Sequence, residues 1–422
     1  MRSGALVLLT LCGTARVVSA QVVQDTVLAR LTAEALATNP SLLRTEAATR
    51  AANARVPAAG ALPDPTLTAG VMNLTLPRFA FRESDFTEVD VELGQELPWP
   101  GTLGARTDAA RAEARARSAE ASVRRREVAV RVAELYHSLQ YVATAQAVLV
   151  RQQRLLTAGV EVSTARYATT SAPQVDPLQA RVAVARLDAE AVDLTARDAT
   201  LHAALRAVRG VTGRDDLIVE SLDPSQIHTA LAPADDGPRA DSTVALGAHP
   251  RVSAREALLE AAERTARAEA LMARPDFMVM TRYGARPLGP DFFSASVGIR
   301  LPLWAGRKQR KLAEAARADT DEAREAVAEA RAELAAEVET IAVEVRRGEQ
   351  HLRLLVERVV PTARETAEAS LRSYRAGQAD FATVLAAQDA LYRAELDAAR
   401  ATAEHLTHRV MQTQLLAPEE AP

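Results

Sequence analysis

The chain has 422 residues, a formal net charge of −4 and 48% hydrophobic residues, yet only 4% of its residues are aromatic. Scarce aromatic residues and abundant alanine between charges favour narrow helix seams over a thick globular core, and the mixed charges give no indication of nucleic-acid binding. After the first 20 residues there is no run of about 18 apolar residues, so the sequence holds no candidate transmembrane helix and any membrane span must be β.

Residues 1–20 have the features of an export signal peptide. One arginine precedes an apolar run, and small residues lead up to Ala20, which predicts cleavage between Ala20 and Gln21. The single cysteine, Cys12, lies inside this segment and directly follows Leu11, which argues against lipidation of the N-terminus. The mature chain is then free of cysteine, which excludes disulfides and thiolate metal sites.

The remainder of the chain is a twofold repeat, marked by three pairs of matching motifs. They are Asn39-Pro40 with His249-Pro250, Pro63-Asp64 with Pro275-Asp276, and ELPWPGTLGAR (residues 96–106) with RLPLWAGRKQR (residues 300–310). A long helical stretch follows the last motif in both copies. We therefore expect one structural unit to occur twice.

The repeat divides the chain into a signal peptide (1–20), a first repeat (21–209), an irregular linker with room for one short strand (210–248), a second repeat (249–416) and a tail (417–422). Each repeat is predicted to contain two strands and two long helices. In the first repeat these are strands at about 66–74 and 85–97 and helices at about 102–165 and 177–209; in the second, strands at about 277–283 and 292–301 and helices at about 306–372 and 381–415.

The long helices carry apolar residues at alternating spacings of three and four, which is typical of coiled-coil seams. The first seam contains Val128, Val132, Leu135, Leu139 and Val142, and the second contains Val327, Ala330, Leu334, Val338, Ile341 and Val345. Such narrow stripes are best buried against neighbouring helices.

The second strand of the first repeat alternates apolar residues with four carboxylates, Glu88, Asp90, Glu92 and Glu96. About ten alternating residues suit a β-span with its apolar face toward lipid and its polar face toward a lumen. The acidic face could concentrate cations, although the need for polarity toward water explains it more simply. Four strands cannot close a barrel in lipid, so the chain must oligomerise.

The two-copy plan, the LPWPG and LPLWAG strand exits, and a YxxGxxDF-like turn at residues 374–381 together resemble the TolC-like outer membrane efflux proteins. The PWPG form is similar to the heavy-metal (CzcC/CusC-like) branch. This resemblance implies a mainly α fold with a small membrane β-barrel portion. Three chains would supply four strands each to a 12-stranded barrel and continue it as a periplasmic α-barrel.

The resemblance also implies a function and partners. The chain would be an outer-membrane exit duct of a Gram-negative bacterium, with a large periplasmic portion, no enzymatic activity and no cofactor. Its partners would be two further copies of itself, a periplasmic adaptor (membrane fusion) protein, an inner-membrane resistance-nodulation-division pump and outer-membrane lipid. Heavy-metal cations are the first expectation for the cargo. Export of drugs or other organic compounds, type I polypeptide secretion, and a pore-free coiled-coil scaffold are the alternatives.

The turns between the long and returning helices would form the periplasmic tip, which contacts the adaptor or gates the tunnel. The tip residues are Arg166, Tyr167, Thr170 and Asp176 in the first repeat, and Tyr374, Gly377, Asp380 and Thr383 in the second. Thr170 stands where the second copy has Gly377, so the two turns are expected to differ. Some relatives carry gate carboxylates where this chain has Thr383 and Ala386, which leaves Asp176 and Asp380 as substitutes.

Outside the tip, the most plausible metal ligands are His405 and His408, which stand three residues apart on a predicted helix. No third ligand accompanies them in the sequence, so we expect an exposed helical face rather than a metal site.

Overall fold

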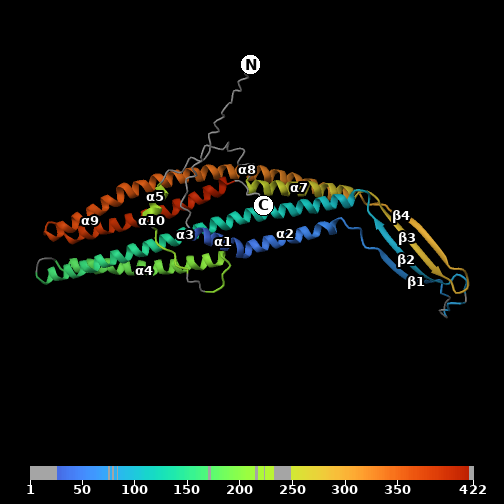
Figure 1. Cartoon of the computed structure of the whole chain (residues 1–422), viewed down its shortest axis with the longest axis horizontal. Helices are drawn as coiled ribbons and strands as arrows, with labels where there is room; N and C mark the ends of the chain where they lie inside the picture. Colours follow the sequence, from blue (N-terminus) through green and yellow to red (C-terminus); the bar gives the residue numbers. More distant parts are fainter. Residues whose placement is uncertain are drawn as a thin grey trace, which may run out of the picture.

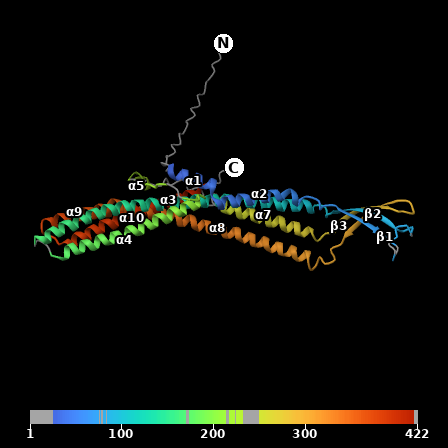
Figure 2. The same cartoon turned by 90° about the horizontal axis from the view of Figure 1, so that it is seen from below.

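The computed structural model describes residues 26–417 except 75–76, 78–79, 83, 170–172, 214–216, 223 and 232–248. The molecule is elongated, with the helices running along its length and a four-stranded sheet at one end (Figure 1). A second view, turned by 90°, shows the same arrangement, with α4, α9 and α10 at the end opposite the sheet (Figure 2). Among the described residues, no helix is both long and apolar enough to cross a membrane.

Both repeats contain a short helix, two strands and a hairpin of long helices, in that order, and the first repeat has one further helix, α1, before them. The first consists of α1 (Thr26–Thr38), α2 (Pro40–Ala59), β1 (Thr66–Met72), β2 (Glu88–Leu97), α3 (Thr102–Ala168) and α4 (Val175–Val208). The second consists of α7 (Pro250–Leu271), β3 (Asp276–Ala285), β4 (Phe292–Arg300), α8 (Gln309–Leu354), the π-helical segment η1 (Leu355–Val359), α9 (Val360–Arg375) and α10 (Phe381–Leu416). Between them lies α5 (Pro224–Leu231).

Matching caps begin the short helix of each repeat. In α2, the Asn39 carboxamide oxygen accepts hydrogen bonds from the backbone N–H groups of Ser41 and Leu42, each at 3.0 Å. In α7, His249 Nδ1 accepts from the backbone N–H of Arg251 at 3.2 Å. A proline follows both caps, at a position where the helix needs no N–H donor. The duplicated motifs in the sequence are therefore duplicated helix starts.

The predicted seam of the first long helix is buried, which confirms it. Its five residues are at most 3% exposed and belong to two apolar clusters that α3 forms with α1, α4 and α10. In the second seam, Leu334 is fully buried and Val327, Ile341 and Val345 are nearly so. Packing along the helices thus follows the spacing of the apolar residues.

Two predicted segments differ from the structure. The helix expected at about 306–372 begins at Gln309 and is interrupted by the π-helical segment Leu355–Val359, just before Pro361. Proline lacks an N–H donor and its ring crowds the preceding turn, so the local widening of the helix accommodates it. The linker contains the helix α5 in its described part, where the sequence allowed a short strand. Its Ala230 is fully buried in a cluster with α8 and α10.

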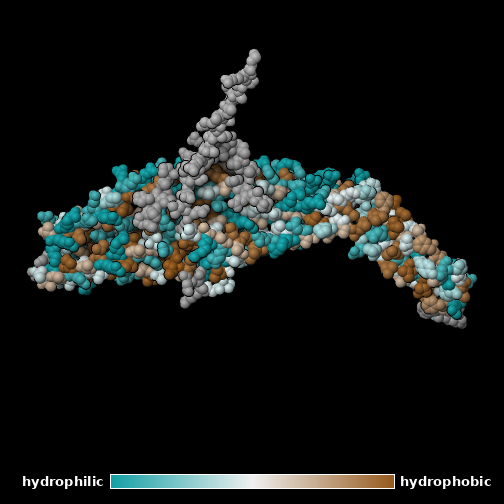
Figure 3. All heavy atoms as spheres, viewed as in Figure 1, coloured by the Kyte–Doolittle hydropathy of each residue, from teal (hydrophilic) through white to brown (hydrophobic). Residues whose placement is uncertain are grey.

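The sheet has the order β1-β2-β3-β4, with every neighbouring pair antiparallel. The central pair, β2 with β3, joins the two repeats. One face of the sheet is apolar and exposed, as shown by the concentration of hydrophobic side chains over the strands in Figure 3. Its most exposed members are Leu67, Phe293, Val297 and Ile299, which are 58–74% exposed.

Candidate functional site: the strand face and the helical tip

The polar face of the sheet carries paired charges. Arg282 on β3 donates to Glu92 on β2 at 2.6 and 3.0 Å and lies 3.7 Å from Asp90. Arg286 lies 3.7 Å from Glu88, and Arg300 on β4 is paired with Glu96. The lumen-facing strand expected to be acidic therefore belongs to a nearly balanced network. The β2–β3 register, which places Glu92 opposite Arg282, is the physical reason.

The sheet is inverted relative to that of a water-soluble protein, in that carboxylates on its charged face are buried and its apolar face is exposed. On β2, Glu88 and Asp90 are each only 5% exposed, whereas the intervening Val89 and Val91 are 42% and 43% exposed. A sheet that hides its carboxylates and presents its aliphatic side chains is unfavourable in water, because exposed apolar area costs free energy. The arrangement suits lipid on the apolar face and a polar lumen on the other.

At the far end of the helices, side chains from both repeats meet. The Arg166 guanidinium at the end of α3 donates to the backbone carbonyl of Tyr374 on α9 at 2.8 Å and lies 4.5 Å from the centre of the Tyr374 ring. That ring packs against Phe381 at a centroid distance of 5.3 Å. Asp176 is buried nearby at the start of α4. Burial raises the pKa of the Tyr374 phenol above its ordinary value.

Asp380 and Thr383 have a structural role in the second turn. The Asp380 carboxylate caps α10 by accepting hydrogen bonds from the backbone N–H and the hydroxyl of Thr383. These hydrogen bonds lower the pKa of Asp380. Gly377, with φ of +74°, supplies the left-handed residue that ends the preceding helix. Asp380 is thus a charged group held in a fixed position at the N-terminus of α10.

The remaining predicted residues are dispersed. Tyr167 is 44% exposed and lies outside the cluster formed by Arg166, Asp176, Tyr374 and Phe381, hereafter the tip cluster. Thr170, Ala20 and Gln21 lie outside the described residues. The sequence did not single out Gly159 on α3, which lies against Phe381: a Cβ at Gly159 would make an ordinary van der Waals contact with the Phe381 ring at 3.5 Å. In the sequence, only the Asp380-Phe381 pair of the second turn pointed to the packing of Phe381.

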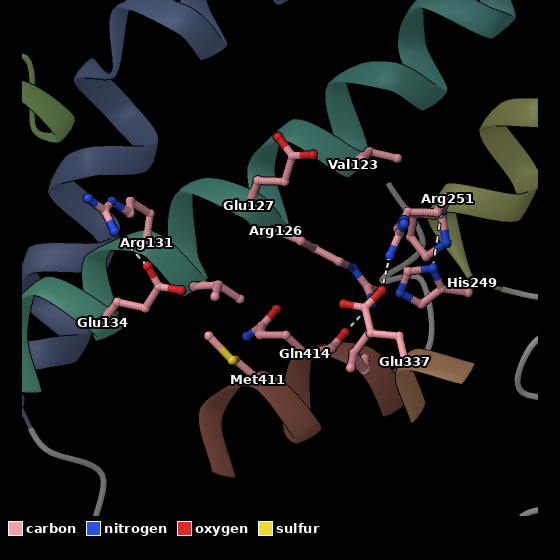
Figure 4. Close-up of a pocket in the computed structure, with 13 residues that line it drawn as sticks. Val123, Arg126, Glu127, Arg131, Glu134, His249, Arg251, Glu337, Met411 and Gln414 are labelled. Carbon is pink, nitrogen blue, oxygen red and sulfur yellow. Dashed lines mark hydrogen bonds and ion pairs between the residues drawn. The ribbon is translucent and has the colours of Figure 1, made fainter. Parts of the chain in front are cut away.

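A groove of about 520 Å³ lies midway along the molecule, between α3, α7, α8 and the end of α10. In Figure 4, His249 sits beside Arg251, which is paired with Glu337, while Arg126 reaches the end of α10. Burial, together with the charges of Arg126 and Arg251, lowers the pKa of His249 to about 4. The charged groups here engage one another and join the two repeats.

The interpretation of His405 and His408 as an exposed face is wrong for His405. This residue is only 2% exposed, and its Nε2 lies 3.0 Å from the Ala230 carbonyl on α5. The imidazole also packs against Gly348 on α8. A Cβ at position 348 would lie 2.9 Å from His405 Nδ1, so this packing requires a glycine. Burial lowers the pKa of His405. Among the described residues, no cluster of three metal-ligating side chains occurs.

Solved structures with the same fold include two outer-membrane proteins and CusC, whose structures describe the formation of a transmembrane channel. VceC from Vibrio cholerae matches with a TM-score of 0.76 at 18% identity, over 94% of this chain and 97% of that one. CusC matches with a TM-score of 0.80 at 15% identity, over 94% and 93% of the two chains. The Campylobacter jejuni CmeC outer membrane channel matches with a TM-score of 0.74 at 12% identity, over 92% and 85%. No curated protein sequence matches the chain significantly.

These structural matches confirm the predicted fold class, a mainly helical chain that contributes four strands. At the level of sequence, a family model described as outer membrane efflux protein matches residues 31–211 and 242–417. The two matched segments correspond to the two repeats and cover most of the chain. The protein therefore belongs to the outer membrane efflux protein family, whose members are passive conduits of the outer membrane and not enzymes.

Proposed function

We propose that the chain forms, as a homotrimer, the outer-membrane exit duct of a tripartite efflux system and conducts its cargo passively. The observation that carries this proposal is the inverted sheet, with exposed aliphatic residues on one face and paired charges on the other. In a bilayer, the apolar face would contact lipid and the polar face would line water. A scaffold without a pore would have no use for this alternation.

The contacts between the two repeats support the homotrimer. Inside the chain, β2 pairs with β3, α3 packs on α7, and α10 packs on α3. The equivalent surfaces at the outer sides of the repeats have no partner within the described chain: the outer edges of β1 and β4, and the exposed apolar residues of α4 and α8. Repeating the internal contact between copies closes a ring, and three copies supply 12 strands.

The tip cluster supports a gate at the periplasmic end. Arg166 ties the first helical hairpin to the second through Tyr374, so separating the hairpins requires breaking this contact. Docking of an adaptor protein at the tips would favour an open packing by binding it more tightly than the closed one. A resistance-nodulation-division pump in the inner membrane would supply the energy. We assign Asp176 to the contact that closes the gate, beside Arg166 and Tyr374, and Asp380 to the periplasmic entrance of the tunnel.

For the cargo, we propose heavy-metal cations, on the strength of the PWPG strand exit. The ion-pair network on the polar face of the sheet has four carboxylates against three guanidinium groups, a balance that gives little preference for cations. The choice of cargo then belongs to the pump. This balance also favours a second candidate, export of organic compounds through the same duct.

Deletion of the gene in its own host tests the function and the cargo together. The deletion strain should lose tolerance to one or more divalent heavy metals, and a plasmid copy of the wild-type gene should restore it. Sensitivity confined to organic compounds would replace the metal assignment by the second candidate. Unchanged tolerance to both classes, in a strain without a second gene of the family, would contradict an efflux role.

A further inference from the structure

The turn after β2 is held by a contact with the start of β3. The backbone N–H of Trp99 donates to the Asp276 carboxylate at 3.0 Å. The Trp99 ring stacks on Phe277, with centroids 5.8 Å apart and planes inclined by 20°, and the Arg274 guanidinium lies 5.9 Å from the Trp99 ring centre. This contact, hereafter the junction latch, fixes the exit of the first repeat against the entry of the second, where the sheet meets the helices.

The residue types that form the junction latch occur once more, one at each outer end of the two repeats: an aspartate before β1 and a tryptophan after β4. The entry of the first repeat has Asp64 at the position of Asp276. The exit of the second repeat has Trp304 in the turn LPLWAG, which matches LPWPG with one residue, Leu303, inserted before the tryptophan. The carbonyl groups of Trp99 and Trp304 each accept from the backbone N–H three residues later. Asp64 is exposed, and Trp304 is 72% exposed, whereas Trp99 is half-buried. Within the described chain, neither the Asp64 carboxylate nor the Trp304 backbone N–H has a hydrogen-bond partner.

The β2–β3 register can be transferred to the two free edges of the sheet. In the chain, Gln95 pairs with Val279 and Leu93 pairs with Thr281. The equivalent pairs between β4 and the β1 strand of another copy are Ile299 with Leu67 and Val297 with Ala69. These pairs join apolar face to apolar face, as lipid contact requires. The same transfer brings the turn at residues 302–304 beside Asp64 of the partner subunit.

We propose that Trp304 and Asp64 of the partner subunit form an intersubunit junction latch, in which the Trp304 backbone N–H donates to the carboxylate and the indole packs beside the partner's Leu62 and Pro65. The inference rests on the proposed trimer and names a contact that closes it. The occupant of the exposed Trp304 surface is therefore a second copy of this chain. The three latches would complete a ring of six, three within chains and three between them.

Contact with lipid phosphates is the rival explanation for Trp304, because four basic residues follow it at Arg307, Lys308, Arg310 and Lys311. The first repeat argues against it. There the corresponding tryptophan packs on protein rather than presenting a free face. Lipid contact would also leave Asp64 without a role.

Cysteine pairs test the latch directly, because the predicted mature chain contains no cysteine. The full-length double variant Asp64→Cys, Trp304→Cys is oxidised in isolated outer membranes and run on a non-reducing denaturing gel. We expect covalent dimers and trimers that collapse to monomers on reduction, since a disulfide needs Cα atoms within about 7 Å. Each single variant should remain monomeric. The matched pair Trp99→Cys, Asp276→Cys should crosslink within one chain and stay at monomer size.

A second pair separates the latch from the trimer itself. Leu67→Cys with Ile299→Cys reports the β4–β1 contact between copies. Crosslinking of this pair without crosslinking of Asp64→Cys, Trp304→Cys would overturn the latch, leave the trimer standing and favour lipid contact for Trp304. Failure of both intersubunit pairs, with the matched pair crosslinked, would overturn the latch and the proposed trimer together.

Variants of Asp64 add a readout that does not depend on cysteine. Asp64→Ala removes the acceptor and should lower the temperature at which the detergent-solubilised trimer dissociates. Asp64→Asn retains a carbonyl acceptor and should restore much of that temperature. Equal dissociation temperatures for wild type and Asp64→Ala would overturn the latch.

Discussion

Asn39 and His249 occupy the same capping position in the two repeats, but only His249 can titrate. Its pKa is lowered from 6.5 to about 4 by burial and by Arg126 and Arg251, so the folded state favours the neutral ring. A depressed histidine pKa stabilises the fold above pH 6.5, and this contribution is lost as pH falls toward 4. Its upper limit is roughly 3 kcal/mol.

The variant His249→Asn, which installs the cap of the first repeat, should therefore make stability less dependent on pH. We expect a smaller drop in melting temperature between pH 7 and pH 5 for the variant than for wild type. A residual drop should remain, because burial also lowers the pKa of His405. The change can be followed by circular dichroism in detergent. Equal drops in the two proteins would contradict a buried neutral His249.

Arg166 is the residue on which closure of the tip depends in this account. Arg166→Ala removes a charge-assisted hydrogen bond and a cation–π contact, together about 2 kcal/mol, which would shift a closed–open equilibrium more than tenfold. The variant should conduct more current in planar bilayers than wild type. Tyr167→Ala, at the exposed neighbouring position, should leave the current unchanged. An unchanged current in Arg166→Ala would remove the tip cluster from the gate.

At the scale of elements, the paired charges on β2, β3 and β4 should tune the ion preference of the pore. Arg282→Gln leaves Asp90 and Glu92 uncompensated and should raise the cation-to-anion permeability ratio, measured from the reversal potential in a salt gradient. Glu92→Gln should shift the ratio in the opposite direction. If neither substitution moved the reversal potential, the network would not face the conducting path.

Periodicity predicted the strands and helices because it is a local property of the sequence. The alternation along β2 and the seam of α3 follow from side chains two, three or four residues apart. The ion pairs of Arg282 and the burial of His405 depend on residues about 175 or more positions away, so no local pattern reveals them. The π-helical segment before Pro361 is an intermediate case. The proline predicts an irregularity in the helix, but tertiary packing decides which form it takes.

The candidate site was predictable to a different extent at its two ends. The turn motif placed Tyr374, Gly377 and Asp380 together, because they are close in sequence. The meeting of Arg166 with Tyr374 joins the two repeats over 208 positions and needs the packed hairpins to appear. The carboxylates of β2 were correctly assigned to one face, whereas their neutralisation was not foreseen.

For the whole molecule, duplication explains both the fold and the assembly. The two repeats contact each other through one side of each, and the equivalent surface on the other side of each repeat stays without a partner in a single chain. In the sheet, these surfaces are the free edges of β1 and β4. Joining those edges between copies gives lipid an uninterrupted apolar face and leaves no unpaired backbone in the hydrocarbon. The elongated helices would then extend the same ring away from the membrane.

The central claim is that the polar face of the sheet lines a conducting pore. It is tested most directly by the bilayer current of two β4 variants, Ser296→Cys on the polar face and its neighbour Val297→Cys on the apolar face, before and after a charged, water-soluble thiol reagent. The account predicts that the reagent reduces the current through Ser296→Cys and leaves that through Val297→Cys unchanged. A current that falls only in Val297→Cys, or in neither variant although Ser296→Cys is shown to be modified, would contradict it.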